Sequence, residues 1–142
     1  MMKVLSRFLF WITGWTLVGG WPKGVKNAVL IAVPHTSNWD LLYARAAFFL
    51  MDIPVKFTIK KEAMVGPLGW ILSGLGAIAI DRQRIPSGRK QTYTEAMTVM
   101  LKNRNDLVIM VTPEGTRNAV KKWKTGFYHI ALGAGVPVVI GF

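Results

Sequence analysis

The chain has 142 residues, which suffices for one compact domain around a single core. Hydrophobic residues make up 51% of it, which indicates a folded chain with apolar surface left over for lipid or a partner. Lys and Arg total 18 against 7 Asp and Glu, and the net charge of +11 favours polyanions: nucleic acid, anionic lipid or a phosphorylated substrate. The absence of cysteine excludes disulfides, thiolate zinc sites and a cysteine nucleophile, and two histidines are too few for a His-rich metal site.

The first 22 residues differ from the rest of the chain. Residues 8–22 carry no charge, contain three tryptophans, and as a helix would span about 22 Å. That length is too short for the roughly 30 Å core of a bilayer, but it suits a helix lying in the membrane interface. A helix packed on the core is the alternative. We therefore expect an apolar membrane-interface helix at 1–22 and a single domain at 23–142.

The rest of the chain alternates between two hydrophobic patterns. Five short apolar runs, rich in Val or Ile, have the pattern of buried strands. They lie at residues 28–33, 55–59, 77–80, 107–111 and 136–140. Helical patterns follow at 41–51, 89–102 and 125–134, and the first of these is apolar nearly all round, as in a buried helix. This alternation predicts an α/β fold with a mostly parallel central sheet covered by helices.

A polar segment at 34–40 follows the first predicted strand. It places His35 at the carboxyl end of a strand, where open α/β sheets bind their ligands. An imidazole suits proton transfer near neutral pH, and Asp40 could accept its Nδ1 proton, leaving Nε2 as the base. The alternative is structural, because Ser37-x-x-Asp40 also has the spacing of a helix capping box. The two roles are compatible.

A second polar segment, 112–117, directly follows the strand predicted at 107–111. Gly115 permits a positive φ or a close approach of the backbone. Glu114 could accept a hydrogen bond from a substrate hydroxyl, and Arg117 could grip a phosphate with two donors. The alternative is an ordinary turn with a surface ion pair.

Two further polar groups follow apolar strands. Lys60, Lys61 and Glu62 come after the run at 55–59, and the run at 77–80 ends in Asp81 and Arg82. Each of these alone could be a solvated loop. In a parallel sheet, however, the ends of the strands meet at one edge, so the four groups predict a shared basic cleft.

At these residues the sequence resembles the glycerolipid acyltransferases, the 1-acylglycerol-3-phosphate acyltransferase-like family with a His-x4-Asp motif. The four family motifs are matched in order by His35 with Asp40, Gly76 with Asp81 and Arg82, Pro113 to Arg117, and Val136 to Val139. The resemblance covers residues 27–142. Family members usually continue well past the fourth motif, so the domain at 23–142 could be truncated at its C-terminus.

The resemblance implies transfer of a fatty acyl group from acyl-CoA or acyl-carrier protein to a hydroxyl of a lysophosphatidic-acid-like acceptor. It implies no cofactor or metal beyond that co-substrate. His35 would be the base and Asp40 would orient it. The substrate-binding residues would be Ser37, Lys60, Lys61, Asp81, Arg82, Glu114, Gly115, Thr116 and Arg117. The cations among them would hold the acceptor phosphate, and the N-terminal helix would anchor a peripheral protein to an anionic surface, the cytoplasmic face of the inner or plasma membrane.

Other functions remain open at this point. A hydrolase could use His35 to activate water on an ester or thioester, although the chain has no Gly-x-Ser-x-Gly nucleophile elbow. The basic patch at 121–124 could instead serve a nucleic-acid-binding or anionic-lipid-binding module without catalysis. The tryptophans argue against nucleic acid, because they cluster in the apolar N-terminus.

Overall fold

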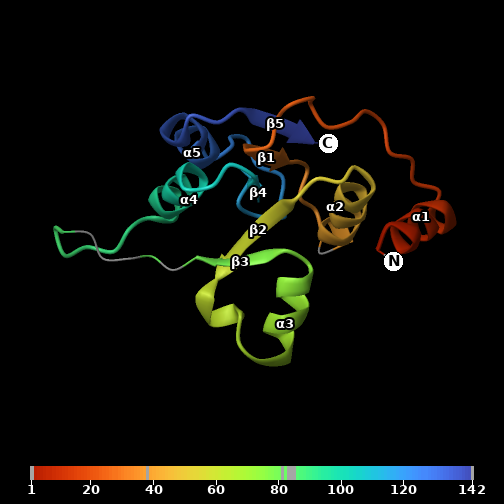
Figure 1. Cartoon of the computed structure of the whole chain (residues 1–142), viewed down its shortest axis with the longest axis horizontal. Coiled ribbons are helices and arrows are strands. Elements are labelled where there is room, and N and C mark those ends of the chain that lie inside the picture. Colours follow the sequence, from red (N-terminus) through yellow and green to blue (C-terminus); the bar gives the residue numbers. More distant parts are fainter. Residues whose placement is uncertain (1, 38, 81, 83–85, 142) are drawn as a thin grey trace.

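The computed structural model describes residues 2–37, 39–80, 82 and 86–141, excepting the side chains of Lys60 and Ala63. Its strands are β1 (Ala28–Ala32), β2 (Val55–Lys60), β3 (Ala77–Ile80), β4 (Val108–Val111) and β5 (Val138–Gly141). They form one sheet in the order β3-β2-β4-β1-β5, and every neighbouring pair is parallel (Figure 1). The predicted α/β fold with a parallel sheet is therefore confirmed.

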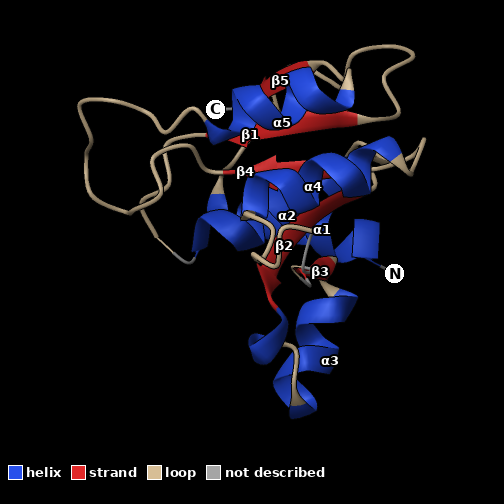
Figure 2. Ribbon diagram, turned by 90° about the vertical axis from the view of Figure 1, so that its left-hand side faces the viewer, coloured by secondary structure: helices blue, strands red, loops and turns tan. Residues whose placement is uncertain are grey.

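Helices cover both faces of this sheet. They are α1 (Met2–Thr13), α2 (Trp39–Leu50), α3 (Gly66–Gly74), α4 (Tyr93–Lys102) and α5 (Gly126–Ala134), with a 3-10 turn η1 (Lys61–Ala63) after β2. In Figure 1, α4 and α5 lie on one side of the sheet and α1 and α2 on the other. Figure 2 shows α4 and α5 from their own side, with α3 projecting below the sheet.

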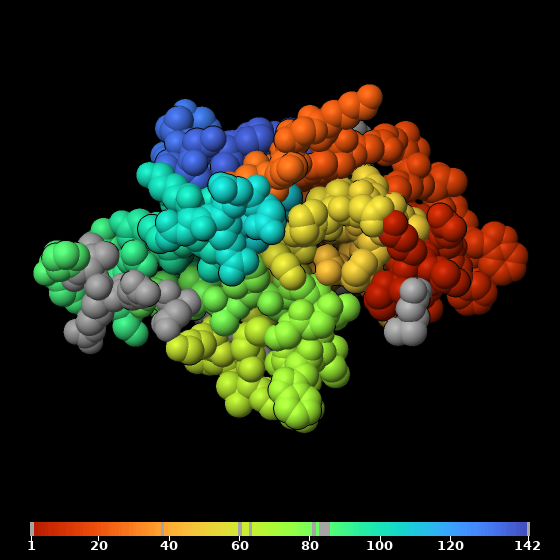
Figure 3. All heavy atoms as spheres, viewed as in Figure 1, coloured from red at the N-terminus to blue at the C-terminus, as the bar shows by residue number. Residues whose placement is uncertain are grey.

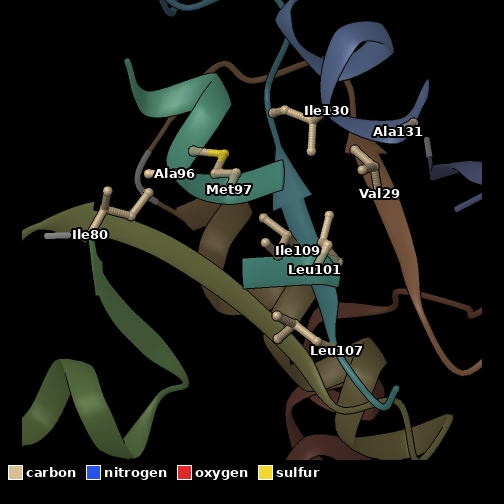
Figure 4. Close-up of a cluster of buried hydrophobic side chains, with 9 residues drawn as sticks. All are labelled: Val29, Ile80, Ala96, Met97, Leu101, Leu107, Ile109, Ile130 and Ala131. Atoms are coloured by element: carbon tan, nitrogen blue, oxygen red, sulfur yellow. The ribbon is translucent and has the colours of Figure 1, made fainter. Parts of the chain in front are cut away.

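Two buried clusters hold these layers together. Successive residues of β1 face opposite sides of the sheet, so Val29 packs under α4 and α5 while Leu30 packs under α2. Figure 4 shows the first cluster, in which Leu101 of α4 and Ile130 of α5 meet Ile109 of β4. The continuously apolar strands β1 and β4 fit this arrangement, because most of their residues are buried on both faces of the sheet, whereas Val138 and Ile140 of the edge strand β5 are exposed.

The N-terminal helix is shorter than the sequence pattern suggests. α1 ends at Thr13 and Gly14 takes a positive φ of 71°, so the prediction of a helix over residues 1–22 is wrong beyond position 13. Trp21 instead packs against the buried cluster that contains Leu30 and Phe48. Its indole Nε1 donates to the Val25 carbonyl at 2.6 Å. None of the described helices combines the length and the apolar character that crossing a bilayer requires.

The helices differ from the sequence predictions in three places. The helix predicted at 41–51 is not buried all round: Ala46 and Phe48 are buried, whereas Leu42 is 40% exposed. α4 begins at Tyr93 rather than at 89, because Thr92 and Glu95 form a reciprocal capping box that fixes its start. α3 was not predicted, since two of its glycines and one proline resemble turn signals; its Pro67 stands in the first turn, where the missing N–H costs nothing.

Candidate active site

The register of the sheet brings the predicted polar groups to one level. Ile31 of β1 pairs with Val111, the last residue of β4, so these two strands end side by side. Phe57 of β2 pairs with Met110, one residue before the end of β4. β3 ends beside β2, with Lys60 opposite Ile80. The carboxyl ends of four strands therefore form one edge, as predicted.

His35 and Asp40 face each other where the chain leaves β1 and enters α2. The Nδ1 atom of His35 lies 3.4 Å from Oδ2 of Asp40, and the two side chains are 26% and 33% exposed. This separation is slightly longer than a hydrogen bond. It places a carboxylate on the Nδ1 side of the ring, which favours the tautomer whose Nε2 carries a free lone pair.

Asp40 also caps the start of α2. Its Oδ2 accepts the backbone N–H of Ser37 at 2.8 Å and that of Thr36, and the Ser37 hydroxyl donates to Oδ1 at 3.2 Å. Desolvation raises the pKa of Asp40, but the amide hydrogen bonds from Ser37 and Thr36 outweigh it and lower the pKa below its usual value of 3.8. The carboxylate therefore stays ionised at any pH where a histidine could act as a base. Asp40 thus caps α2 and also lies beside the His35 ring.

Glu114 is tied to His35 by a contact that the sequence could not reveal. Its Oε2 accepts the backbone N–H of His35 at 2.7 Å, across 79 positions of the chain. The hydrogen bond joins the segment after β1 to the segment after β4. His35 is thus held on two sides by carboxylates, Asp40 at the ring and Glu114 at the backbone.

The loop after β4 folds back on itself beside this contact. The Gly115 N–H donates to the Thr112 carbonyl at 3.2 Å, and the Lys124 N–H donates to the Pro113 carbonyl at 2.8 Å. Gly115 has a φ of +63°, the left-handed conformation that the sequence analysis anticipated for it. Thr116 accepts the Asn118 N–H on its hydroxyl at 3.3 Å, so it braces the turn.

Lys124 also lies at this edge, although the sequence pattern predicts only that it belongs to the basic surface patch at 121–124. A Cβ added to Gly115 would lie 2.7 Å from its Nζ, which means that its side chain runs across the glycine. Only the return of the loop from 115 to 124 brings the two together, and nothing in the local spacing signals that return.

The remaining predicted residues follow β2, β3 and β4. Lys61 is exposed in η1, and Arg117 is exposed in the loop after β4. The Arg82 guanidinium lies over the Tyr93 ring, 4.7 Å from its centre. Asp81 and the side chain of Lys60 fall outside the described residues. Within the described part of the chain, no three His, Asp or Glu side chains gather as they would around a metal ion.

Comparisons with known proteins place the chain in a family. A family model described as Acyltransferase matches residues 21–139. The 1-acyl-sn-glycerol-3-phosphate acyltransferase of Haemophilus influenzae is 29% identical over 82% of this chain and 48% of its own length. Proteins of the same name from Limnanthes douglasii and Escherichia coli K12 are each 31% identical, over 96% and 80% of this chain and 48% and 45% of their own lengths.

The chain spans about half the length of these curated relatives. No solved structure matches it. The family model covers most of the chain, including all four strand ends that carry the polar residues. On this evidence the chain belongs to the glycerolipid acyltransferase family.

Proposed function

We propose that this chain transfers a fatty acyl group from acyl-CoA or acyl-carrier protein to a hydroxyl of a lysophosphatidic-acid-like acceptor. The observation that carries the proposal is the placement of His35 between two carboxylates, Asp40 at 3.4 Å from Nδ1 and Glu114 on its backbone N–H. A held imidazole with a free Nε2, at the edge of a parallel sheet, is suited to remove a proton from a bound hydroxyl.

In this mechanism His35 Nε2 takes the proton of the acceptor hydroxyl as the oxygen attacks the thioester carbonyl. The C–O bond forms, the C–S bond breaks, and the proton passes from His35 to the departing thiolate. Asp40 stabilises the imidazolium that exists between these steps, because it is ionised and lies at Nδ1. Positioned base catalysis of this kind contributes typically about 10²–10⁴-fold.

The acceptor phosphate would be held by cations of neighbouring strand ends. Neighbouring strands lie about 4.8 Å apart, so in the order β1, β4, β2, β3 the end of β3 is about 14 Å from that of β1. The phosphate of a lysophosphatidic acid is only a few bonds from the reacting hydroxyl. Arg117 and the Lys60–Lys61 pair are therefore the nearer candidates in the proposal, and Arg82 would reach the phosphate from further away.

The test is acyl transfer from labelled acyl-CoA to lysophosphatidic acid. His35→Ala should lower the rate by about 10²-fold or more, whereas His129→Ala, which changes the exposed histidine of α5, should leave it within twofold. Full activity of the His35 variant would refute the base assignment. Thioester cleavage that proceeds equally without an acceptor would identify the chain as a hydrolase instead.

We further propose that α1 rests in a membrane interface, with the chain peripheral on the cytoplasmic side. Support comes from its exposed apolar side chains, Val4, Leu5, Phe8, Trp11 and Ile12. A helix with an unpartnered apolar face and tryptophan suits the interface. Phe8→Ser with Trp11→Ser should reduce co-sedimentation with anionic vesicles, while Val99→Ser, an exposed apolar position on α4, should not. Equal loss in both variants would argue against α1.

A further inference from the structure

Lys124 has no part in the function proposed above, yet it lies beside the groups that carry it. Its backbone N–H donates to the Pro113 carbonyl at 2.8 Å, which closes the loop that begins after β4. The neighbouring Glu114 binds the His35 N–H at 2.7 Å. Lys124 is therefore fixed to the segment that also fixes His35.

The side chain of Lys124 runs across Gly115. A Cβ built on Gly115 would lie 2.7 Å from Nζ, 2.9 Å from Cε and 3.1 Å from Cδ, so half of the lysine side chain occupies the space that a larger residue would take. Any side chain at 115 would push the ammonium away. The glycine thus explains how a lysine nine positions later can lie so near the end of β4.

The Lys124 ammonium has no acidic partner among the residues that the structure describes. The side chain is exposed to solvent. α5 begins two residues later at Gly126 with no acid in its first turn, so the positive end of the helix dipole adds to the same field. An exposed lysine side chain normally moves freely in solvent. Here its aliphatic part lies against Gly115, which limits the positions that the ammonium can take.

We propose that Lys124 binds a phosphate group of a substrate, and that Gly115 serves to let it do so. This inference rests on the proposed function and adds a specificity-determining residue to it. A lysine ammonium binds phosphate as a point charge. The phosphate could belong to the lysophosphatidic acceptor or to the coenzyme A donor, and the experiment below separates these sources.

The experiment measures binding without turnover, by calorimetry with the full chain. The ligands are a short-chain lysophosphatidic acid below its micelle concentration, the corresponding monoacylglycerol, and coenzyme A. Lys124→Met should weaken binding of the phosphorylated acceptor about tenfold and leave the monoacylglycerol unchanged. Lys122→Met removes the same charge two residues away and should change nothing, and Lys124→Arg should bind nearly as wild type. Loss confined to coenzyme A would support the phosphate contact and assign it to the donor.

Three binding results would overturn the inference. Lys124→Met could bind every ligand as the wild type does, Lys124→Met and Lys122→Met could lose affinity equally, or the wild type could ignore the phosphate altogether. In turnover, KM for the phosphorylated substrate should rise with kcat within threefold; a fall in kcat alone would also overturn it. Failure of the proposed function is distinguishable, since the wild type would then bind phosphate but transfer no acyl group.

Discussion

The two halves of the functional edge are built differently. In the β1–β4 half, His35 is held by Asp40 at its ring and by Glu114 at its backbone, and the loop after β4 is closed by further hydrogen bonds. In the β2–β3 half, the chain leaves β2 through the exposed turn η1 and the projecting helix α3, visible at the lower side of Figure 3. The apolar residues of α3, such as Trp70 at 83% exposure, cover little of the core. Contacts between separate strand ends therefore hold the groups of the first half, whereas the chain of the second half projects into solvent.

The largest effect should come from Asp40→Asn in the first half. The asparagine oxygen can still accept the Ser37 amide, so the start of α2 should survive, but the side chain is neutral and cannot stabilise an imidazolium. We expect kcat to fall about 10²-fold or more with the melting temperature little changed. Asp52→Asn, an exposed carboxylate that pairs with Lys3, is the control and should keep kcat. An unchanged kcat in Asp40→Asn would leave Asp40 as a cap only.

A smaller loss should follow Glu114→Gln. The glutamine oxygen can still accept the His35 N–H, but a hydrogen bond to an ionised acceptor is about twice as strong as a neutral one. We expect kcat/KM to fall about tenfold, measured with saturating donor. Glu62→Gln makes the same change in η1, in the second half of the edge. If both variants lose activity alike, the contrast between the halves does not hold.

The strands that lead to the second half can be probed through stability at Gly76, which precedes β3 at the end of the strand opposite to the edge. This residue has a φ of +93°, and a Cβ there would lie 3.1 Å from the Arg45 guanidinium and 3.2 Å from the Val55 carbonyl. Gly76→Ala should lower the free energy of unfolding by about 2 kcal/mol, as read from urea titrations. Gly74→Ala, at the end of α3 with open space around it, should be neutral. If Gly76→Ala left the free energy of unfolding unchanged, the backbone at the start of β3 would have shifted to accommodate the added methyl group.

The smallest effect concerns Glu95, outside both halves. Hydrogen bonds from Arg89 and from the Thr92 amide lower its pKa from 4.5 to about 2. Because the folded pKa is the lower one, its contribution to stability is present above about pH 4.5 and is lost as the pH falls through about 2. The melting temperatures of wild type and Glu95→Gln should therefore differ most above pH 5 and converge toward pH 2. A constant difference would contradict the assignment.

Local patterns predicted the parts of the molecule that depend on local physics. The five strands were found within two residues of their ends, since a sheet covered on both faces needs continuously apolar strands. His35 and Asp40 were found because they are five residues apart around a helix start. The start of α4 was placed too early although Thr92-x-x-Glu95 signals it.

Contacts between segments that are distant in the sequence could not be predicted from local sequence patterns. The Glu114 hydrogen bond to the His35 amide and the position of Lys124 over Gly115 depend on the sheet register and on the path of a loop. Arg82 was expected at the acceptor phosphate, and its position over Tyr93 depends on how α4 packs beside β3. Helix α3 was missed because Gly66, Pro67 and Gly69 resemble a turn when read locally.

The shared use of Asp40 constrains how this chain can vary. The same oxygen, Oδ2, accepts the Ser37 amide and faces His35 Nδ1, so the contact that forms the first turn of α2 also places the carboxylate beside the imidazole. An insertion or deletion between His35 and Asp40 would rotate the carboxylate away from the ring and uncap the helix together. The four residues between His35 and Asp40 are therefore required by the fold. Variants that change their number should lose the order of the first turn of α2 and the proposed transfer activity together.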